Sequence, residues 1–170
     1  SLPGDVYARI ASIAAEKGAR LVVDAAGKLL LSTLPHRPFL IKPNREELSA
    51  LFGAPADTDD DVQALAHRLQ EAGAHHVLVS MAGDGALLCT ASGESYRVAA
   101  AKGTVVNSVG AGDSMVGGFL AAFQKTGSLP EALALGAAAG GATAFSVGIA
   151  GFQKVMALYE RLRTEVTRIG

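Results

Sequence analysis

Residues 39–52 read Phe-Leu-Ile-Lys-Pro-Asn-Arg-Glu-Glu-Leu-Ser-Ala-Leu-Phe, an apolar run that passes through a short polar break into a helix pattern. The apolar run Phe39–Ile41 is typical of a short buried strand. Asn44 is a preferred N-cap residue, so we expect a helix over Arg45–Phe52. This stretch therefore predicts a strand that is followed directly by a helix.

The same alternation extends in both directions along the chain. Leu21–Val23 and Val77–Val79 are further short apolar runs, and Ala86–Cys89 and Tyr96–Val98 are expected to pair as antiparallel strands about a Ser92-Gly93 turn. We expect further helices, of which one begins at Asp5 and ends at Lys17-Gly18 and one is opened by Thr58 and Asp59–Asp61 and ended by Gly73. The other expected helices cover Lys28–Leu34, Ser114–Lys125, Pro130–Phe145 and Phe152–Arg168. Strands that alternate with helices predict an α/β fold with a mostly parallel sheet.

Composition indicates one ordinary globular domain over residues 1–170. Hydrophobic residues make up 49% and charged residues 18%, which is too apolar for disorder. A net charge of −1 and 5% aromatic residues favour neither nucleic acid nor a membrane surface as a partner. The single cysteine, Cys89, excludes a disulfide framework and a cysteine-based zinc site, and it suits a reducing, cytoplasmic location. Cys89 lies in an apolar run, so we expect it to be buried.

The segment Asn107–Asp113, Asn-Ser-Val-Gly-Ala-Gly-Asp, follows a strand-like stretch and opens a long helix. Gly110 and Gly112 would let backbone N–H groups converge at the helix start, which predicts an anion hole for a phosphate. Asp113, in the first helical turn, could accept the proton of an attacking hydroxyl. The alternative is that this segment is only a helix entrance with an acidic cap.

Several other polar residues have simpler interpretations. Asp24 follows a strand but has no assigned role, and Lys42 is either a phosphate contact or a solvated lysine. The acids Asp59–Asp61 suit the positive end of a helix better than a metal site. His75 and His76 have no metal-ligand partners at useful spacing, and we expect them to face solvent.

The motif Asn107–Phe119 resembles the C-terminal signature of the PfkB (ribokinase-like) carbohydrate kinases, and it is most similar to their phosphosugar branch. Ser1–Pro3, Leu40–Leu48 and Val79–Ala86 follow the order and spacing of the same family. The resemblance implies a ribokinase-like three-layer α/β/α sandwich. It covers essentially this whole chain but only the C-terminal half of such a kinase, so the N-terminal substrate and lid part is expected to be absent.

The resemblance also implies roles for individual residues. Asp113 matches the catalytic base, and the matching anion hole consists of Gly110, Ala111 and Gly112. Asn44 and Glu47 match an element that positions Mg²⁺, largely through water. The expected nucleotide-binding residues are Ser80, Ala82, Gly83, Gly85, Asn107, Val109, Gly140 and Lys42. The family commonly has glycine where this chain has Ala82. Ala139–Thr143 resembles the helix beside the adenine of the nucleotide, and the alternative is that its small residues serve only close packing between helices.

ATP and Mg²⁺ are the implied cofactors, and a monovalent cation is implied near Asn107, Val109, Thr143 and Ser146. The implied reaction is phosphoryl transfer from ATP to fructose-1-phosphate, which gives fructose-1,6-bisphosphate. Tagatose-6-phosphate or another sugar of the family is an alternative acceptor, and a non-catalytic nucleotide-binding fragment is a second alternative. A phosphosugar, ATP and a second copy of the full-length protein are the expected partners, and the 170 residues alone are expected to be inactive.

Overall fold

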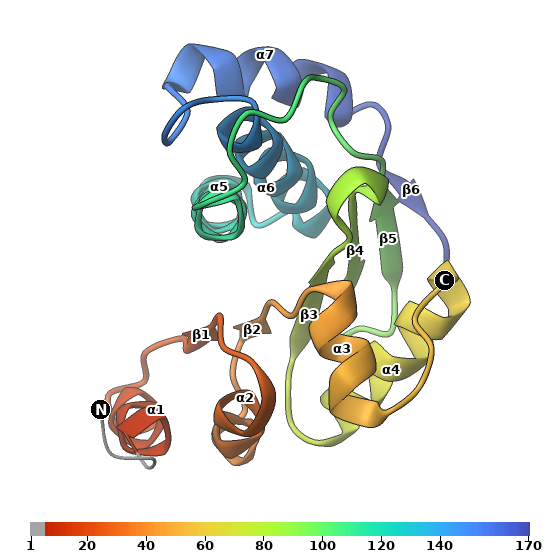
Figure 1. Cartoon of the computed structure of the whole chain (residues 1–170). Coiled ribbons are helices and arrows are strands. Elements are labelled where there is room, and N and C mark those ends of the chain that lie inside the picture. Colours follow the sequence, from red (N-terminus) through yellow and green to blue (C-terminus); the bar gives the residue numbers. More distant parts are fainter. Residues whose placement is uncertain (1–5) are drawn as a thin grey trace. The chain divides into compact units, whose positions relative to one another are not determined.

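The computed structural model describes residues 6–170, which divide into two compact units (Figure 1). The first unit contains the residues up to Val79 and Leu88–Glu94, and the second contains Ser80–Leu87 and Ser95–Gly170. The predicted cap Asp5 and the motif Ser1–Pro3 lie outside the described residues. That the whole chain forms a single domain stays a prediction.

The strands of the first unit are short and parallel. They are β1 (Val22–Val23), β2 (Leu40–Ile41) and β3 (His76–Ser80). In the ladders, Val23 pairs with Ile41, and Ile41 pairs with Val77. These three central side chains are 5% exposed or less, as expected for strands that are covered on both faces. The predicted parallel strands are therefore confirmed.

Four helices follow or precede these strands. They are α1 (Val6–Glu16), α2 (Gly27–Thr33), α3 (Arg45–Phe52) and α4 (Asp59–Glu71). The buried face of α4 consists of Val62, Leu65, Ala66 and Leu69. By contrast, Ile10 and Ile13 on α1 are each 56% exposed. α2 ends at Thr33, one residue before the predicted end, and a 3₁₀ turn follows over Leu34–His36.

At the start of α4, the third of the three acids, Asp61, takes part in capping the helix. The Thr58 hydroxyl accepts a hydrogen bond from the Asp61 N–H at 3.1 Å, and the Asp61 carboxylate accepts one from the Thr58 N–H at 3.0 Å. This is a capping box. The Thr58 hydroxyl also donates to the carboxylate, and these bonds lower the pKa of Asp61.

His76 does not face solvent, so that prediction is wrong. Its side chain lies in β3 and is 9% exposed, with the ring edge-on to Phe39 at 4.9 Å between centroids. Its Nδ1 accepts the N–H of Ala91 at 3.1 Å, which requires the neutral ring. Burial, followed by the charges of His75 and Arg20, lowers the pKa of His76 to about 4.

The second unit contains β5 (Ser95–Val98) and β6 (Thr167–Arg168), which pair antiparallel. The strand β4 (Ala86–Cys89) crosses the boundary between the units, and Cys89 is fully buried as predicted. The predicted helix over Phe152–Arg168 is wrong in its last turns, since α7 ends at Leu162. The β-branched Val166 and Thr167 favour extended backbone, and Thr167 and Arg168 pair with β5 in place of continuing the helix.

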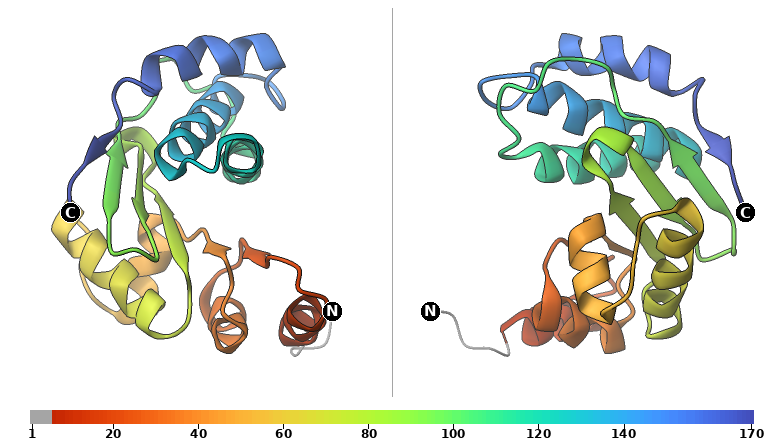
Figure 2. Two further views of the ribbon diagram at one scale, coloured as in Figure 1. Left: turned by 180° about the vertical axis from the view of Figure 1, so that it is seen from behind. Right: turned by 45° about the vertical axis from the view of Figure 1, so that its right-hand side comes forward.

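The helices of the second unit are α5 (Ala111–Thr126), α6 (Leu129–Ala144) and α7 (Phe152–Leu162). α6 packs against both α5 and α7, with α5 and α7 on different sides of it (Figures 1 and 2). It is rich in alanine and glycine and mostly buried, which lets its neighbours approach closely. None of the helices within residues 6–170 combines the length and apolarity needed to span a bilayer. Parallel strands with flanking helices and one antiparallel pair give the α/β fold that was predicted.

Candidate active site

The glycine loop, Asn107–Gly112, makes a tight left-handed turn at Gly110 where α5 begins. Gly110 is the N-cap of α5 with φ 79° and ψ 0°, a backbone conformation that residues with a Cβ rarely adopt. The N–H of Ala111 donates to the carbonyl of Ser108 at 3.1 Å. Among the hydrogen bonds of residues 6–170, none uses the N–H groups of Gly112 or Asp113. The first turn of α5 thus presents two backbone donors at its positive end, where an anion is stabilised.

Asp113 lies in the first turn of α5, as predicted, and its side chain is exposed. No ion pair or side-chain hydrogen bond within residues 6–170 engages its carboxylate. An acidic cap would bond back to the N-terminal backbone, as Asp61 does in α4, and Asp113 does not. The geometry therefore leaves Asp113 available to receive a proton from a bound hydroxyl.

The loop before Gly110 is held by the C-terminal end of α6. The N–H groups of Val106 and Asn107 both donate to the carbonyl of Ala144, at 2.8 and 3.1 Å. The Asn107 side chain donates through Nδ2 to the carbonyl of Val147 at 3.2 Å and accepts the N–H of Val109 at 3.0 Å. Asn107 thus joins the loop before α5 to the loop after α6 and also holds the N–H of Val109. The contacts of Asn107 and Val109 with a nucleotide stay predictions.

Gly140 is buried in the interface between α5 and α6. A Cβ there would lie 3.1 Å from the carbonyl oxygen of Ala111 and 3.3 Å from the Cβ of Met115. Close helix packing, the alternative considered for Ala139–Thr143, is thus present in the structure. Gly140 lets α6 contact the residue that begins α5, and its predicted contact with a nucleotide stays a prediction.

The segment Ser80–Gly85, predicted to bind nucleotide, begins at the last residue of β3 and continues as a 3₁₀ turn over Ala82–Asp84. The Met81 N–H donates to the carbonyl of Gly85 at 2.8 Å, and the three residues between them are exposed. Gly85 has φ 97°, and a Cβ there would lie 2.2 Å from the carbonyl oxygen of Val98, so only glycine fits. Ala82 adopts φ 46°, the left-handed region that favours glycine. The departure from the family pattern at Ala82 therefore falls on a residue with backbone strain.

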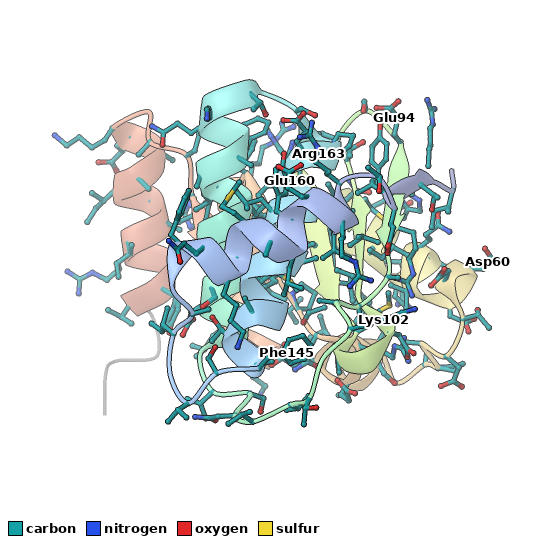
Figure 3. All side chains as sticks on the ribbon, turned by 90° about the horizontal axis from the view of Figure 1, so that it is seen from above. Asp60, Glu94, Lys102, Phe145, Glu160 and Arg163 are labelled. Atoms are coloured by element: carbon teal, nitrogen blue, oxygen red, sulfur yellow. The ribbon has the colours of Figure 1, made fainter. Side chains whose placement is uncertain are left out.

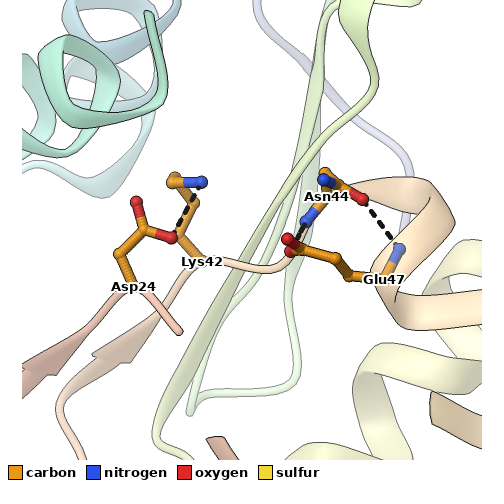
Figure 4. A network of polar contacts seen from close by, with 4 residues as sticks. All are labelled: Asp24, Lys42, Asn44 and Glu47. Atoms are coloured by element: carbon orange, nitrogen blue, oxygen red, sulfur yellow. Dashed lines mark hydrogen bonds and ion pairs between the residues drawn. The ribbon is translucent and has the colours of Figure 1, made fainter. Parts of the chain in front are cut away.

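In the first unit, Lys42 is buried and forms an ion pair with Asp24 (Figure 4). The Lys42 Nζ lies 3.2 Å from the Asp24 Oδ1. Lys42 directly follows β2 and Asp24 directly follows β1, so the parallel register brings them side by side. Lys42 is thus not a solvated lysine. Asp24, to which sequence reasoning assigned no role, is its partner, and the signal was its place directly after a buried strand.

Asn44 and Glu47 form a capping box at the start of α3 (Figure 4). The Asn44 Oδ1 accepts the Glu47 N–H at 2.7 Å, and the Glu47 Oε2 accepts the Asn44 N–H at 2.9 Å. The predicted helix Arg45–Phe52 and its cap are confirmed. The box orients the Glu47 carboxylate and leaves its second oxygen outside these bonds.

This arrangement fits only a Mg²⁺ ion that keeps most of its waters and takes few protein ligands. In the described part of the chain, no group of three or more His, Cys, Asp and Glu side chains is placed to hold a metal ion. Mg²⁺ usually keeps several waters and takes one or two protein carboxylates besides substrate phosphates. Glu47 can supply one such carboxylate oxygen.

The residues predicted for the site belong to two groups, one in each unit. The first unit contains Lys42, Asn44 and Glu47, and the second contains the glycine loop, Asp113, Ser80–Gly85 and Gly140.

Comparison with known proteins relates this geometry to a family. The family model described as "pfkB family carbohydrate kinase" matches residues 1–154. The 1-phosphofructokinase of Bacillus subtilis is 48% identical over 146 residues, which are 86% of this chain and 48% of that protein. The D-tagatose-1-phosphate kinase of Bacillus licheniformis is 38% identical over 155 residues, 91% of this chain and 51% of that protein.

Solved structures agree with this assignment. A crystal structure of a Staphylococcus aureus protein superposes with a TM-score of 0.88 at 39% identity, covering 99% of this chain and 54% of that one. Phosphofructokinase-2 of Escherichia coli, solved in complex with potassium, superposes with a TM-score of 0.86 at 31% identity, over 95% of this chain and 53% of that one. A ribokinase of Arabidopsis thaliana, 23% identical over 93% of this chain and 53% of that one, shares the fold with a TM-score of 0.82.

The chain spans about half the length of the curated relatives that it matches. The matched region includes the glycine loop, Asp113 and both capping-box residues of α3. Family model, relatives and solved structures all point to one group of proteins, with the ribokinase-like fold. The chain belongs to the PfkB family of carbohydrate kinases.

Proposed function

We propose that this chain is the nucleotide-binding and catalytic part of an ATP-dependent phosphosugar kinase. The observation that carries the proposal is the start of α5, where Gly110, two backbone donors and an unengaged Asp113 carboxylate occur within one turn. Donors at a helix start stabilise a phosphoryl group whose charge is redistributed during transfer. A carboxylate beside them can remove the proton from the attacking oxygen.

In the proposed reaction, one phosphoryl group passes from ATP to a hydroxyl of the sugar. A sugar hydroxyl oxygen forms a bond to the γ-phosphorus of ATP, the bond from that phosphorus to the β,γ-bridging oxygen breaks, and ADP leaves. Asp113 takes the hydroxyl proton. The N–H groups at the start of α5 hold the transferred phosphoryl group. The resemblance to the family assigns Mg²⁺ to Glu47 and Asn44, which would hold it through its waters, and assigns to Lys42 the supply of positive charge to the phosphates.

The proposed acceptor is fructose-1-phosphate, which yields fructose-1,6-bisphosphate. The support is the similarity to the Bacillus subtilis relative, and the similarity to the tagatose-1-phosphate kinase favours a tagatose phosphate as the second candidate. A coupled assay of the full-length protein with fructose-1-phosphate, tagatose-1-phosphate, tagatose-6-phosphate and fructose-6-phosphate separates these acceptors. The highest kcat/KM is expected for fructose-1-phosphate. No turnover with any of them would favour a non-catalytic nucleotide-binding protein.

The role of Asp113 is tested by Asp113→Asn in the full-length kinase. We expect turnover to fall by roughly 10²- to 10⁴-fold, while the dissociation constant of ATP changes little. Asp60→Asn is the matched control, because Asp60 is also an exposed acid in the first turn of a helix, α4. Near-normal turnover of Asp113→Asn, or an equal loss in both variants, would contradict the proposed base.

A further inference from the structure

The loop after α6, residues 145–151, contains a lysine contact that the proposed reaction does not use. The Lys154 ammonium, from the first turn of α7, donates to the carbonyl of Phe145 and to the Ser146 hydroxyl, the latter at 2.9 Å. Phe145 is the C-cap of α6, and it lies where that helix ends (Figure 3). The C-terminal end of a helix carries partial negative charge, so a cation is stabilised there.

The oxygens around this loop do not fit a separate monovalent cation. The Thr143 hydroxyl donates to the Ser114 hydroxyl at 2.9 Å and accepts the Ala150 N–H at 3.2 Å. The Ser146 hydroxyl donates to the carbonyl of Ala142 at 2.8 Å and accepts from Lys154. The Asn107 side chain is engaged at both ends by Val147 and Val109. These side chains are thus committed to protein partners, and a positive charge already lies on Ser146.

We propose that Lys154 is a positioning residue, whose tethered ammonium takes the place of a bound monovalent cation at the end of α6. An ammonium and a potassium ion carry the same charge, and both are stabilised by carbonyl and hydroxyl oxygens. A second cation at these oxygens would be repelled by the first. The kinase therefore needs no added potassium. This inference rests on the proposed function, because the loop that Lys154 holds supports Asp113.

Hydrogen bonds within the second unit connect Lys154 to the glycine loop. Lys154 fixes residues 145 and 146, and the next residue, Val147, accepts the Asn107 amide. Asn107 in turn accepts the N–H of Val109, the residue before Gly110. Loss of the ammonium should loosen residues 145–151 first and then the entry into α5. Since small displacements of a catalytic group cost large factors in rate, turnover should report the change.

The test is Lys154→Met, which removes the charge and keeps a long side chain, with Lys125→Met on the exposed end of α5 as its matched control. Turnover of the full-length kinase is measured in sodium, potassium and ammonium chloride at one ionic strength. Wild type and Lys125→Met should differ by less than about twofold between the salts, whereas Lys154→Met should lose about tenfold in kcat in sodium and regain most of it in potassium or ammonium. The free cation would then occupy the oxygens that the lysine vacates.

Amide hydrogen exchange supplies a readout that does not depend on catalysis. In Lys154→Met, the amides of residues 145–151 and of Val109 should exchange about tenfold faster in sodium and slow again in potassium. A wild type that itself requires potassium, or a Lys154→Met variant with wild-type exchange and turnover in every salt, would overturn the inference. A full-length protein that phosphorylates no phosphosugar would overturn the proposed function instead, and the exchange measurement would still decide the role of Lys154.

Discussion

The ammonium of Lys42 and the carboxylate of Asp24 form an unequal ion pair, because the lysine side chain is 7% exposed and the aspartate side chain 37%. A buried charge that loses its counter-ion is costly, whereas a half-exposed carboxylate that loses its partner is solvated by water. The two members of the pair should therefore respond differently to substitution.

We predict that Asp24→Asn destabilises the protein by about 2 kcal/mol, because it leaves the buried ammonium without its counter-ion. Lys42→Met should lower the free energy of unfolding by less than about 1 kcal/mol, because methionine is apolar and leaves no buried charge without a partner. Unfolding by urea measures both. The exposed pair of Arg163 and Glu160, labelled in Figure 3 and separated by 3.6 Å, is the control, and Glu160→Gln should cost no more than about 0.5 kcal/mol. A larger cost for Lys42→Met than for Asp24→Asn would contradict this account.

This pair also shows the limit of prediction from the sequence. Both residues were identified as polar residues at the ends of strands, and this placement is confirmed. Their pairing depends on the register of β1 against β2, with Val23 opposite Ile41, and on the burial of Lys42. Register arises from contacts between distant segments, so local pattern did not reveal it.

Local signals predicted well where the stabilising contacts are themselves local. Asn44 and Thr58 were identified as helix starts, and each is the N-cap of its helix. The segment Asn107–Asp113 opens a helix as predicted, although α5 begins at Ala111 and not at Ser114. Prediction failed where a distant partner decides. Thr167 pairs with Arg97 of β5 instead of continuing α7, and His76 is buried through its place in β3.

Backbone strain at Ala82 gives a second prediction. The residue has φ 46°, where a Cβ clashes with the adjacent carbonyl and glycine does not. Ala82→Gly should stabilise the protein by about 0.5 kcal/mol, because relief of strain slightly exceeds the entropy that glycine adds to the unfolded chain. Thermal unfolding measures the change. Gly85→Ala is the opposing variant and should destabilise strongly, since its Cβ would lie 2.2 Å from the Val98 carbonyl oxygen. A destabilised Ala82→Gly would show that the left-handed backbone carries no strain.

The buried His76 predicts a dependence of stability on pH. Its pKa is lowered from 6.5 to about 4, so the unfolded chain binds a proton that the folded chain does not bind between these values. The contribution is complete above about pH 6.5 and falls as the pH decreases toward 4, by about 3 kcal/mol in total. Protonation would also remove the acceptor for the Ala91 N–H.

The matched variant for this prediction is His76→Gln, which cannot titrate. Urea unfolding at a series of pH values should show a shallower loss of stability for His76→Gln than for wild type between pH 6.5 and 4. The variant is expected to be less stable at pH 7, where its difference from wild type should be greatest. Parallel curves for the two proteins would assign the pH dependence to other groups.

The two capping boxes allow a structural role to be separated from a role in metal binding. Glu47 closes the box of α3 and Asp61 closes the box of α4, with the same pair of reciprocal hydrogen bonds. Glu47→Gln and Asp61→Asn both keep an oxygen that can accept the N-cap N–H while they remove the negative charge. Both variants should therefore keep their helices.

Only Glu47→Gln should change the response of the full-length kinase to Mg²⁺. A neutral amide is a weaker ligand for Mg²⁺ and its waters than a carboxylate, so the Mg²⁺ concentration for half-maximal activity should rise by about tenfold. Asp61→Asn should leave that concentration unchanged. Circular dichroism confirms that both proteins remain folded, and titration with Mg²⁺ at saturating ATP gives the decisive number. Equal Mg²⁺ dependence in the two variants would restrict Glu47 to its structural role at the start of α3.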